Sequence, residues 1–196
     1  MPTVTGLRED RRGRVAVELD GSPWRVLPAD VVVRAGLLQG RSLDRAALRL
    51  LRRELRRAEA LQVATRALRS RDLSRRRLAE RLERAAVPPV AAVESLGTLT
   101  RAGLVDDVRV ARMRALALAE RGYGDEAIRH RLGEEGLELE TVEEAVAGLG
   151  PELERALRLI ERRGTGPRTA RYLAARGFGE EAVEAALGQE GRAAIG

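Results

Sequence analysis

Few side chains in this sequence of 196 residues have the types and spacing that catalysis requires. His130 is the one histidine and there is no cysteine, whereas a zinc site needs four ligands, or three and a water. Nucleophilic schemes that pair Ser or Cys with His have almost no members to draw on here. We therefore expect a protein that is not an enzyme, with no catalytic residue, no cofactor and no metal site, and we expect His130 to lie at or near the surface.

Asp106 and Asp107 form an adjacent carboxylate pair. Such a pair could serve acid–base chemistry or bind Mg²⁺. The pair also stands directly before a helix expected over 108–120, where Asp side chains accept hydrogen bonds from free N–H groups and complement the helix dipole. We favour helix capping, with Asp107 also able to bond back across the junction between two helical units.

Two glycine pairs, Gly122 with Gly124 and Gly164 with Gly166, look like fragments of phosphate-binding loops. Neither pair follows an expected strand, and no Gly-Lys-Ser or Gly-Lys-Thr comes after it, so the context of a nucleotide-binding loop is missing. These glycines therefore predict breaks between helices.

Arginine is the most unevenly distributed residue type. The net charge is +6, but residues 41–84 hold 15 Arg against 6 acidic residues, and residues 85–150 hold 7 Arg against 12. All Lys and Arg positions are Arg, and a codon bias of the genome is enough to explain this preference without a functional need for Arg. The candidate cluster for contact with a partner or DNA is Arg71, Arg75, Arg76, Arg77, Arg81 and Arg84.

Two interpretations of this cluster stay open. It is either a solvated helix face or a surface that contacts phosphate groups or an acidic protein groove. Like charges this close destabilise a helix, which favours a partner modestly. Aromatic residues make up 2% of the chain, too few for a platform on which bases stack.

One phrase occurs three times: Leu, three mostly polar residues, a tiny residue, then an apolar one. The copies are Leu82–Val87, Leu132–Leu137 and Leu173–Phe178. This pattern is typical of a helix end at which the small residue adopts the left-handed conformation and the apolar residue folds back on the last turn. Three copies that start at 82, 132 and 173 predict stacked helical units in an extended array. Ala86, Gly136 and Gly177 are the expected caps.

The N-terminal segment predicts a β-hairpin and a short helix. Val15 and Val17 alternate with polar or small residues, and Asp20-Gly21 supplies a two-residue turn that would place Val17 opposite Trp24. A helix capped by Ser42 then extends to about 69, with a break near 57 left open. The expected helices are 58–69, 74–85, 89–102, 108–120, 124–135, 139–147, 151–163, 167–176 and 179–187.

The fold class is therefore mainly α: three tandem three-helix repeats in an elongated array, preceded by the hairpin and helix. The expected segments are the N-terminal hairpin and helix 1–41, a linking helix 42–57, repeats 58–105, 106–149 and 150–188, and a tail 189–196. No apolar run approaches 18 residues and no signal peptide is recognisable, so we expect a cytoplasmic protein without a membrane span.

The ordered set of short motifs resembles the RecX family of bacterial regulatory proteins, the modulators of the RecA recombinase. The resemblance covers about residues 12–188. Val110 stands where the family usually has Phe, and Arg77 stands where an acid is common. The matching pieces are Asp20-Gly21, Gly36-Leu37, Gly40, Ala67-Leu68-Arg69, Leu73-Ser74, Leu78, Leu82, Leu99, Gly103-Leu104-Val105-Asp106-Asp107, Arg109-Val110-Ala111, Arg121-Gly122-Tyr123-Gly124, Leu132, Gly136, Tyr172-Leu173 and Arg176-Gly177-Phe178.

The resemblance implies three three-helix units in a curved shape that bind within the groove of the RecA filament on DNA. It implies lower recombinase, ATPase and co-protease activity of RecA, and so an effect on recombinational repair and the SOS response. A monomer with weak direct DNA contact fits this expectation. The alternative is an autonomous DNA-binding protein that uses three-helix units as helix-turn-helix readers.

Overall fold

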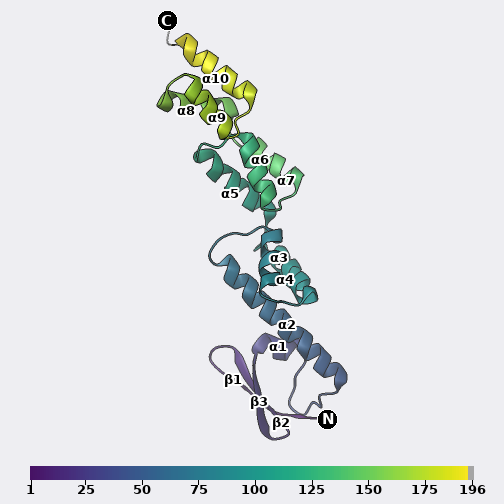
Figure 1. The fold of residues 1–196 in the computed structure, drawn as a ribbon. Coiled ribbons are helices and arrows are strands. Elements are labelled where there is room, and N and C mark those ends of the chain that lie inside the picture. Colours follow the sequence, from purple (N-terminus) through teal and green to yellow (C-terminus); the bar gives the residue numbers. More distant parts are fainter. Residues whose placement is uncertain (194–196) are drawn as a thin grey trace. The chain divides into compact units, whose positions relative to one another are not determined.

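The computed structural model describes residues 1–193, and these are mostly helical (Figure 1). A three-stranded antiparallel sheet of order β1-β2-β3 comes first, and ten helices follow within the described residues. The prediction of a mainly α chain is confirmed. The elements are β1 Val4–Glu9, β2 Arg14–Leu19, β3 Ser22–Pro28, α1 Ala29–Arg34, α2 Arg45–Leu68, α3 Arg75–Arg84, α4 Pro89–Arg101, α5 Asp107–Glu120, α6 Asp125–Glu134, α7 Leu139–Ala147, α8 Glu152–Arg163, α9 Pro167–Ala175 and α10 Glu180–Ala193.

The predicted hairpin forms, but its register differs from the expected one. Asp20 and Gly21 adopt φ angles of +50° and +80°, as a two-residue turn of this kind requires. Val17 pairs with Arg25 and not with Trp24, because Trp24 is an extra residue that forms a bulge opposite the register shift between Val17 and Glu18. The bulge turns Leu27 into the core, where it is 1% exposed.

The sheet also has a strand that the sequence did not reveal. β1 pairs antiparallel with β2, and Val4 at its start is fully buried. Along β1 the apolar positions do not alternate regularly, and Gly6 sits beside an irregularity in the pairing. The period-two pattern that identifies a half-buried strand is therefore weak here.

α2 is one unbroken helix of 24 residues, so the break considered near 57 does not occur. Asp44, and not Ser42, is its N-cap: the Asp44 carboxylate accepts a hydrogen bond from the Ala47 N–H at 2.6 Å. Ser42 is drawn into the extended segment instead, where it bridges to Thr3 and the two hydroxyls lie 3.3 Å apart. The prediction of a Ser42 cap was wrong by two residues.

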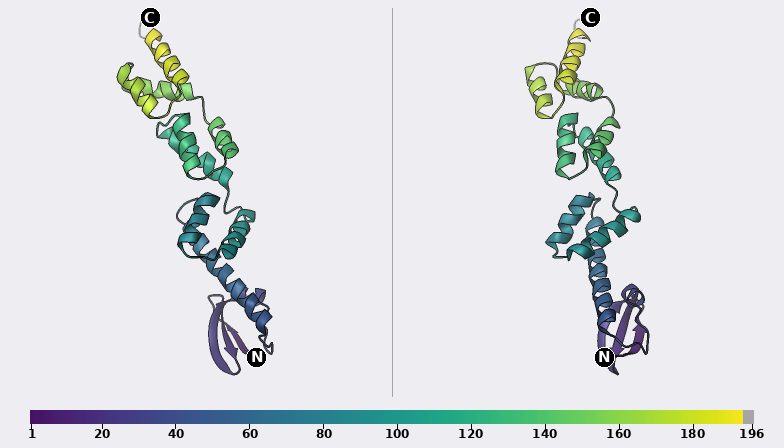
Figure 2. Two further views of the ribbon diagram at one scale, coloured as in Figure 1. Left: turned by 45° about the vertical axis from the view of Figure 1, so that its right-hand side comes forward. Right: turned by 90° about the vertical axis from the view of Figure 1, so that its right-hand side faces the viewer.

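The chain forms two compact units. The first unit consists of Met1–Arg71 and Leu78–Ala102, and the second of Asp72–Arg77 and the chain from Gly103 onward. In the first unit the sheet and α1 share an apolar core with the first turns of α2, and α4 lies along α2, with Glu94 beside Arg53 and Thr98 beside Arg57 (Figures 1 and 2). The core of its N-terminal part includes Val4, Val17, Leu27, Val31 and Leu43.

The second unit holds two apolar clusters. One gathers α5, α6 and α7 around Ile128 and Leu132, and the other gathers α8, α9 and α10 around Ile160, Leu173 and Phe178. α10 continues to Ala193, so the expectation of a tail was wrong for residues 189–193, which are helical. Residues 194–196 of the expected tail lie outside the described residues. The division into three repeats at 58, 106 and 150 stays a prediction.

Candidate partner-binding site

The thrice-repeated phrase ends α3, α6 and α9 in the same way. Ala86, Gly136 and Gly177 have φ angles of +55°, +74° and +75°. In each copy the N–H of the next residue donates to the carbonyl of the leucine that begins the phrase, at 3.0, 3.4 and 3.1 Å in chain order. This is the hydrogen bond that defines a Schellman cap. The predicted caps are confirmed, and they end α3, α6 and α9.

Within the second unit the start of α3 meets the end of α6, and we call this contact the first joint. Ser74, which is fully buried, donates its hydroxyl proton to the Glu135 carbonyl at 2.7 Å and accepts from the Arg77 N–H at 3.2 Å. The Asp107 carboxylate, at the start of α5, accepts from the Arg75 N–H at 2.7 Å. Asp107 therefore does bond back to the start of α3, as the sequence suggested.

The second joint repeats this plan where the start of α6 meets the end of α9. The Gly124 N–H donates to the Arg176 carbonyl at 2.9 Å, and the Glu126 N–H donates to the Gly177 carbonyl at 3.0 Å. Glu152, at the start of α8, has the same role as Asp107 in the first joint. Its carboxylate accepts a hydrogen bond from the N–H of Asp125, at the start of α6, at 2.6 Å. Gly124 is needed because a Cβ there would collide with the Gly177 carbonyl.

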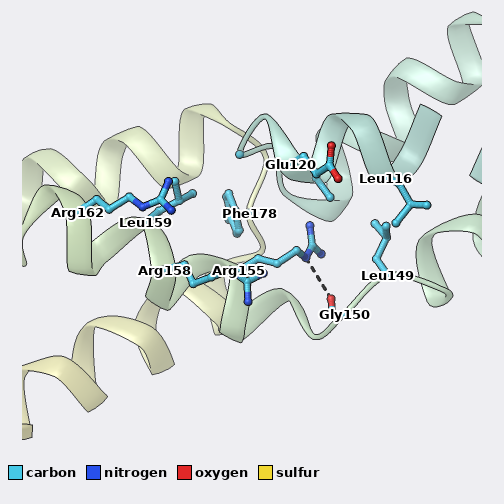
Figure 3. A pocket seen from close by; sticks show the side chains of 11 residues that line it. Leu116, Glu120, Leu149, Gly150, Arg155, Arg158, Leu159, Arg162 and Phe178 are labelled. Carbon is cyan, nitrogen blue, oxygen red and sulfur yellow. Dashed lines mark hydrogen bonds between the residues drawn. The ribbon is translucent and has the colours of Figure 1, made fainter. Parts of the chain in front are cut away.

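A buried arginine crosses the second joint (Figure 3). Arg155 donates to the carbonyls of Gly150 and Tyr123, each at 3.1 Å, and its guanidinium also pairs with the Asp125 carboxylate. Its side chain is only 7% exposed. Beside it lies a pocket of about 340 Å³ whose apolar lining includes Leu116 and Phe178. These contacts fix the position of Arg155 and indicate that its role is structural.

Arg155 and Glu152 were missed by the sequence analysis. They lie in the run Glu-Leu-Glu-Arg, which is indistinguishable from a solvated helix face when only the sequence is known. The one available signal was that Glu152 begins a helix, as Asp107 does at the start of α5.

The structure separates the six arginines of the candidate cluster by their contacts. Arg77 donates to the Glu134 carbonyl at 3.0 Å, so it belongs to the first joint. Arg84 lies 3.4 Å from the Glu80 carboxylate. Arg71, Arg75 and Arg81 are exposed, and no ion pair of theirs occurs among the described side chains.

Arg76, the sixth member, is exposed but packs its aliphatic stem against Gly136, where a Cβ would collide with it. The exposed arginines whose side chains make no joint contact, Arg71, Arg75 and Arg81, are therefore the ones suited to meet a partner.

The remaining residues singled out from the sequence have structural parts. Asp106 is the N-cap of α5 and accepts from the Arg109 N–H at 2.9 Å, so the capping interpretation is confirmed. Gly103 and Gly122 follow α4 and α5 with positive φ. Leu104 is half exposed, at 51%.

His130 has a side chain that is 76% exposed, and its Nε2 lies 3.8 Å from a Glu134 carboxylate oxygen. Over the part of the chain that the structure describes, no three His, Cys, Asp or Glu side chains gather as metal ligands, and no helix is long and apolar enough to cross a membrane.

A second group of arginines lies outside the predicted cluster. Arg49, Arg52, Arg53 and Arg56 of α2 line a groove together with Pro88–Ala91 and Glu94 at the start of α4. The excess of Arg over 41–84 is evident from the sequence, but the segment that faces these four side chains is not.

These features define a class of protein: a mainly helical chain in which helix starts bond to the capped ends of other helices, with exposed arginines around them. Comparison with known proteins gives the family. The regulatory protein RecX of Xanthomonas oryzae pv. oryzae is 36% identical over 126 residues, which cover 59% of this chain and 79% of that protein. The regulatory protein RecX of Stenotrophomonas maltophilia is 33% identical over 126 residues, covering 59% of this chain and 77% of that protein. No family model matches the chain.

Solved structures agree on the fold. A crystal structure of a regulatory protein RecX has a TM-score of 0.81 at 19% identity and covers 94% of this chain and 98% of that one. The crystal structure of RecX from Lactobacillus salivarius has a TM-score of 0.62 at 15% identity, covering 68% and 96%. The chain belongs to the RecX family of regulatory proteins.

Proposed function

We propose that this chain regulates RecA by binding the RecA filament on DNA and lowering its recombinase, ATPase and co-protease activities. Membership of the RecX family is the observation that carries the proposal. The resulting effect is to tune recombinational DNA repair and the SOS response, in the cytoplasm and as a monomer.

The side chains support a part in binding and not in catalysis. His130 is exposed, and its Nε2 lies 3.8 Å from a Glu134 carboxylate oxygen, a surface contact and not the pairing with a nucleophile that catalysis of this kind needs. Asp106 and Asp107 are engaged with backbone N–H groups of helix starts. A protein that binds along a filament can add several weak contacts through effective concentration, so no single deep site is required.

Arg71, Arg75 and Arg81 are the contacts we propose for an acidic filament surface or for DNA phosphate. All three are exposed, and their guanidinium groups make none of the joint contacts that the side chains of Arg76 and Arg77 make; Arg75 enters the first joint only through its backbone N–H. Guanidinium groups pair with carboxylate or phosphate in a bidentate way, which suits this part. Arg84, paired with Glu80, would contribute less.

The test is the ATPase rate of RecA on single-stranded DNA with and without this protein. We expect the wild-type chain to lower the rate, and the triple variant Arg71→Glu/Arg75→Glu/Arg81→Glu to lose most of that effect. The control is Arg8→Glu/Arg11→Glu/Arg12→Glu, which makes the same charge change at three exposed residues around the first hairpin. An unchanged RecA rate with the wild-type chain, at saturating amounts, would refute the proposal.

The second candidate function is autonomous DNA binding, favoured by the excess of Arg over acidic residues in 41–84. Binding of this kind weakens steeply as salt rises, because counterions are released from the phosphates. The acidic segment 85–150 counts against a surface that tracks DNA along the whole chain. Tight, strongly salt-dependent binding to duplex DNA without RecA would favour this function over the first.

A further inference from the structure

A groove in the first unit lies outside the predicted cluster. It runs between α2 and the start of α4 and has a volume of about 420 Å³. One side is basic and the other is mostly apolar. Its lining consists of Arg49, Arg52, Arg53, Arg56, Pro88, Pro89, Val90, Ala91 and Glu94.

The basic side is a continuous stripe on α2. Positions 49, 52, 53 and 56 share one helix face, since residues three and four apart are neighbours on a helix surface. Arg53 is held by Glu94 at 2.5 Å, and this hydrogen bond, together with the negative charge of Glu94, raises the pKa of Arg53 above its ordinary value. Arg49, Arg52 and Arg56 are exposed and have no ion pair among the described side chains.

Such a stripe weakens the helix that carries it. Arg49 with Arg53, and Arg52 with Arg56, are like-charge pairs four residues apart, an arrangement that destabilises helices. One carboxylate, Glu94, faces four guanidinium groups in the groove. The stripe is thus short of negative charge, and a ligand that supplies carboxylates would relieve the repulsion.

The opposite side offers exposed aliphatic surface on a rigid frame. Pro88 is the N-cap of α4 and Pro89 is its first residue, where the fixed φ of proline suits the helix. Val90 is 69% exposed, and Val93, one turn further along α4, is 65% exposed. Two exposed valines beside a basic stripe call for a ligand with an apolar side chain as well as negative charge.

We propose that this groove binds an acidic peptide segment of a protein partner, with its carboxylates on the guanidinium groups of Arg49, Arg52 and Arg56 and an aliphatic side chain against Val90. Nucleic acid fits less well, because phosphates leave the two valines uncovered. The groove wall also has no aromatic residue on which a base could stack. The proposal does not depend on RecA being the partner.

The test is fluorescence anisotropy with the full chain and a labelled dodecapeptide that repeats Glu-Glu-Leu. We expect Arg49→Gln/Arg52→Gln/Arg56→Gln to weaken binding about tenfold, the sum of three exposed ion pairs. The control Arg8→Gln/Arg11→Gln/Arg12→Gln removes the same charge and should leave the affinity within about twofold. Val90→Ser keeps every charge, and we expect it to weaken binding about threefold through lost apolar contact.

Two further probes separate the kinds of ligand. A Gln-Gln-Leu peptide should bind at least tenfold more weakly than Glu-Glu-Leu, and a single-stranded DNA dodecamer should not compete with the acidic peptide. No binding of the acidic peptide, or equal losses in the groove variant and the control, would overturn the proposal. Tighter binding of the DNA, with the same dependence on Arg49, Arg52 and Arg56, would replace it with a nucleic-acid surface. Circular dichroism checks that each variant keeps its helicity.

Discussion

The two joints of the second unit both bring a helix start to the capped end of another helix, but different groups bond across them. In the first joint the buried Ser74 hydroxyl and the Asp107 carboxylate accept from N–H groups at the start of α3, and the Ser74 hydroxyl also donates to the end of α6. In the second joint the helix start is bonded by its own backbone to the end of α9, and Glu152 and Arg155 add charge from α8. The comparison shows that the repeat specifies where backbone groups must be satisfied, and leaves open which side chains satisfy them.

The two joints differ in how much a single side chain contributes to the free energy of unfolding. Arg155 is buried, and its guanidinium satisfies two carbonyls and a carboxylate, so its removal leaves three acceptors without a donor. At the first joint Asp107 accepts one hydrogen bond from a backbone group close to solvent. We therefore expect the second joint to be the more sensitive of the two to substitution.

The largest effect should follow Arg155→Ala. Removing one partner of a buried, hydrogen-bonded ion pair costs about 3–5 kcal/mol, and here the loss includes the donor of the partly buried Asp125 carboxylate and of the Gly150 and Tyr123 carbonyls. We expect the free energy of unfolding of the second unit to fall by about that amount in urea titrations of the full chain. Arg158→Ala, an exposed arginine on the same helix, is the matched control and should change it by less than about 0.5 kcal/mol.

An intermediate effect separates the caps of the two joints. A Cβ at Gly177 would lie 2.5 Å from the backbone nitrogen of Ala127, whereas at Gly136 it would meet the flexible stem of Arg76. Gly177→Ala should therefore cost about 2–4 kcal/mol, and Gly136→Ala about 1–2 kcal/mol, mostly for the left-handed backbone. Thermal unfolding of the two variants measures the difference; equal losses would show that the close approach to Ala127 relaxes without cost.

The smallest effect concerns the carboxylates. Asp107→Ala should lower stability by about 1 kcal/mol, the usual value of a lost side-chain cap. Glu152→Ala should cost more, because Glu152 also accepts from the Gly179 N–H at 3.3 Å and is partly buried. The order of the two variants in one urea series checks this, and a larger loss for Asp107→Ala would reverse the ranking of the joints.

Much of the fold could be predicted because local sequence rules suffice for it. The caps at Ala86, Gly136 and Gly177 follow from helix periodicity and from the small residue that a left-handed position requires. The same logic identified Asp106 as a cap. The same rules wrongly favoured Ser42 over Asp44 as the N-cap of α2, because both residue types cap helices well. The contact that engages Ser42 instead comes from Thr3, which is distant in sequence.

The candidate site was less predictable because charge alone does not reveal contacts. Six arginines close in sequence were treated as one cluster, yet Arg77 faces the end of α6 and Arg76 packs on Gly136. The bulge at Trp24 and the buried position of Arg155 likewise depend on partners that are distant in sequence. Such long-range contacts leave no periodic trace in the residues themselves.

The central claim is that this chain acts on the RecA filament, and the most direct measurement is filament disassembly. RecA is assembled on fluorescent single-stranded DNA, and its loss is followed after dilution with and without this protein. We expect the wild-type chain to speed net loss of RecA from the DNA, and the Arg71→Glu/Arg75→Glu/Arg81→Glu variant to act more weakly. Identical RecA loss with and without the wild-type chain, together with no binding of the chain to the filament, would contradict the account.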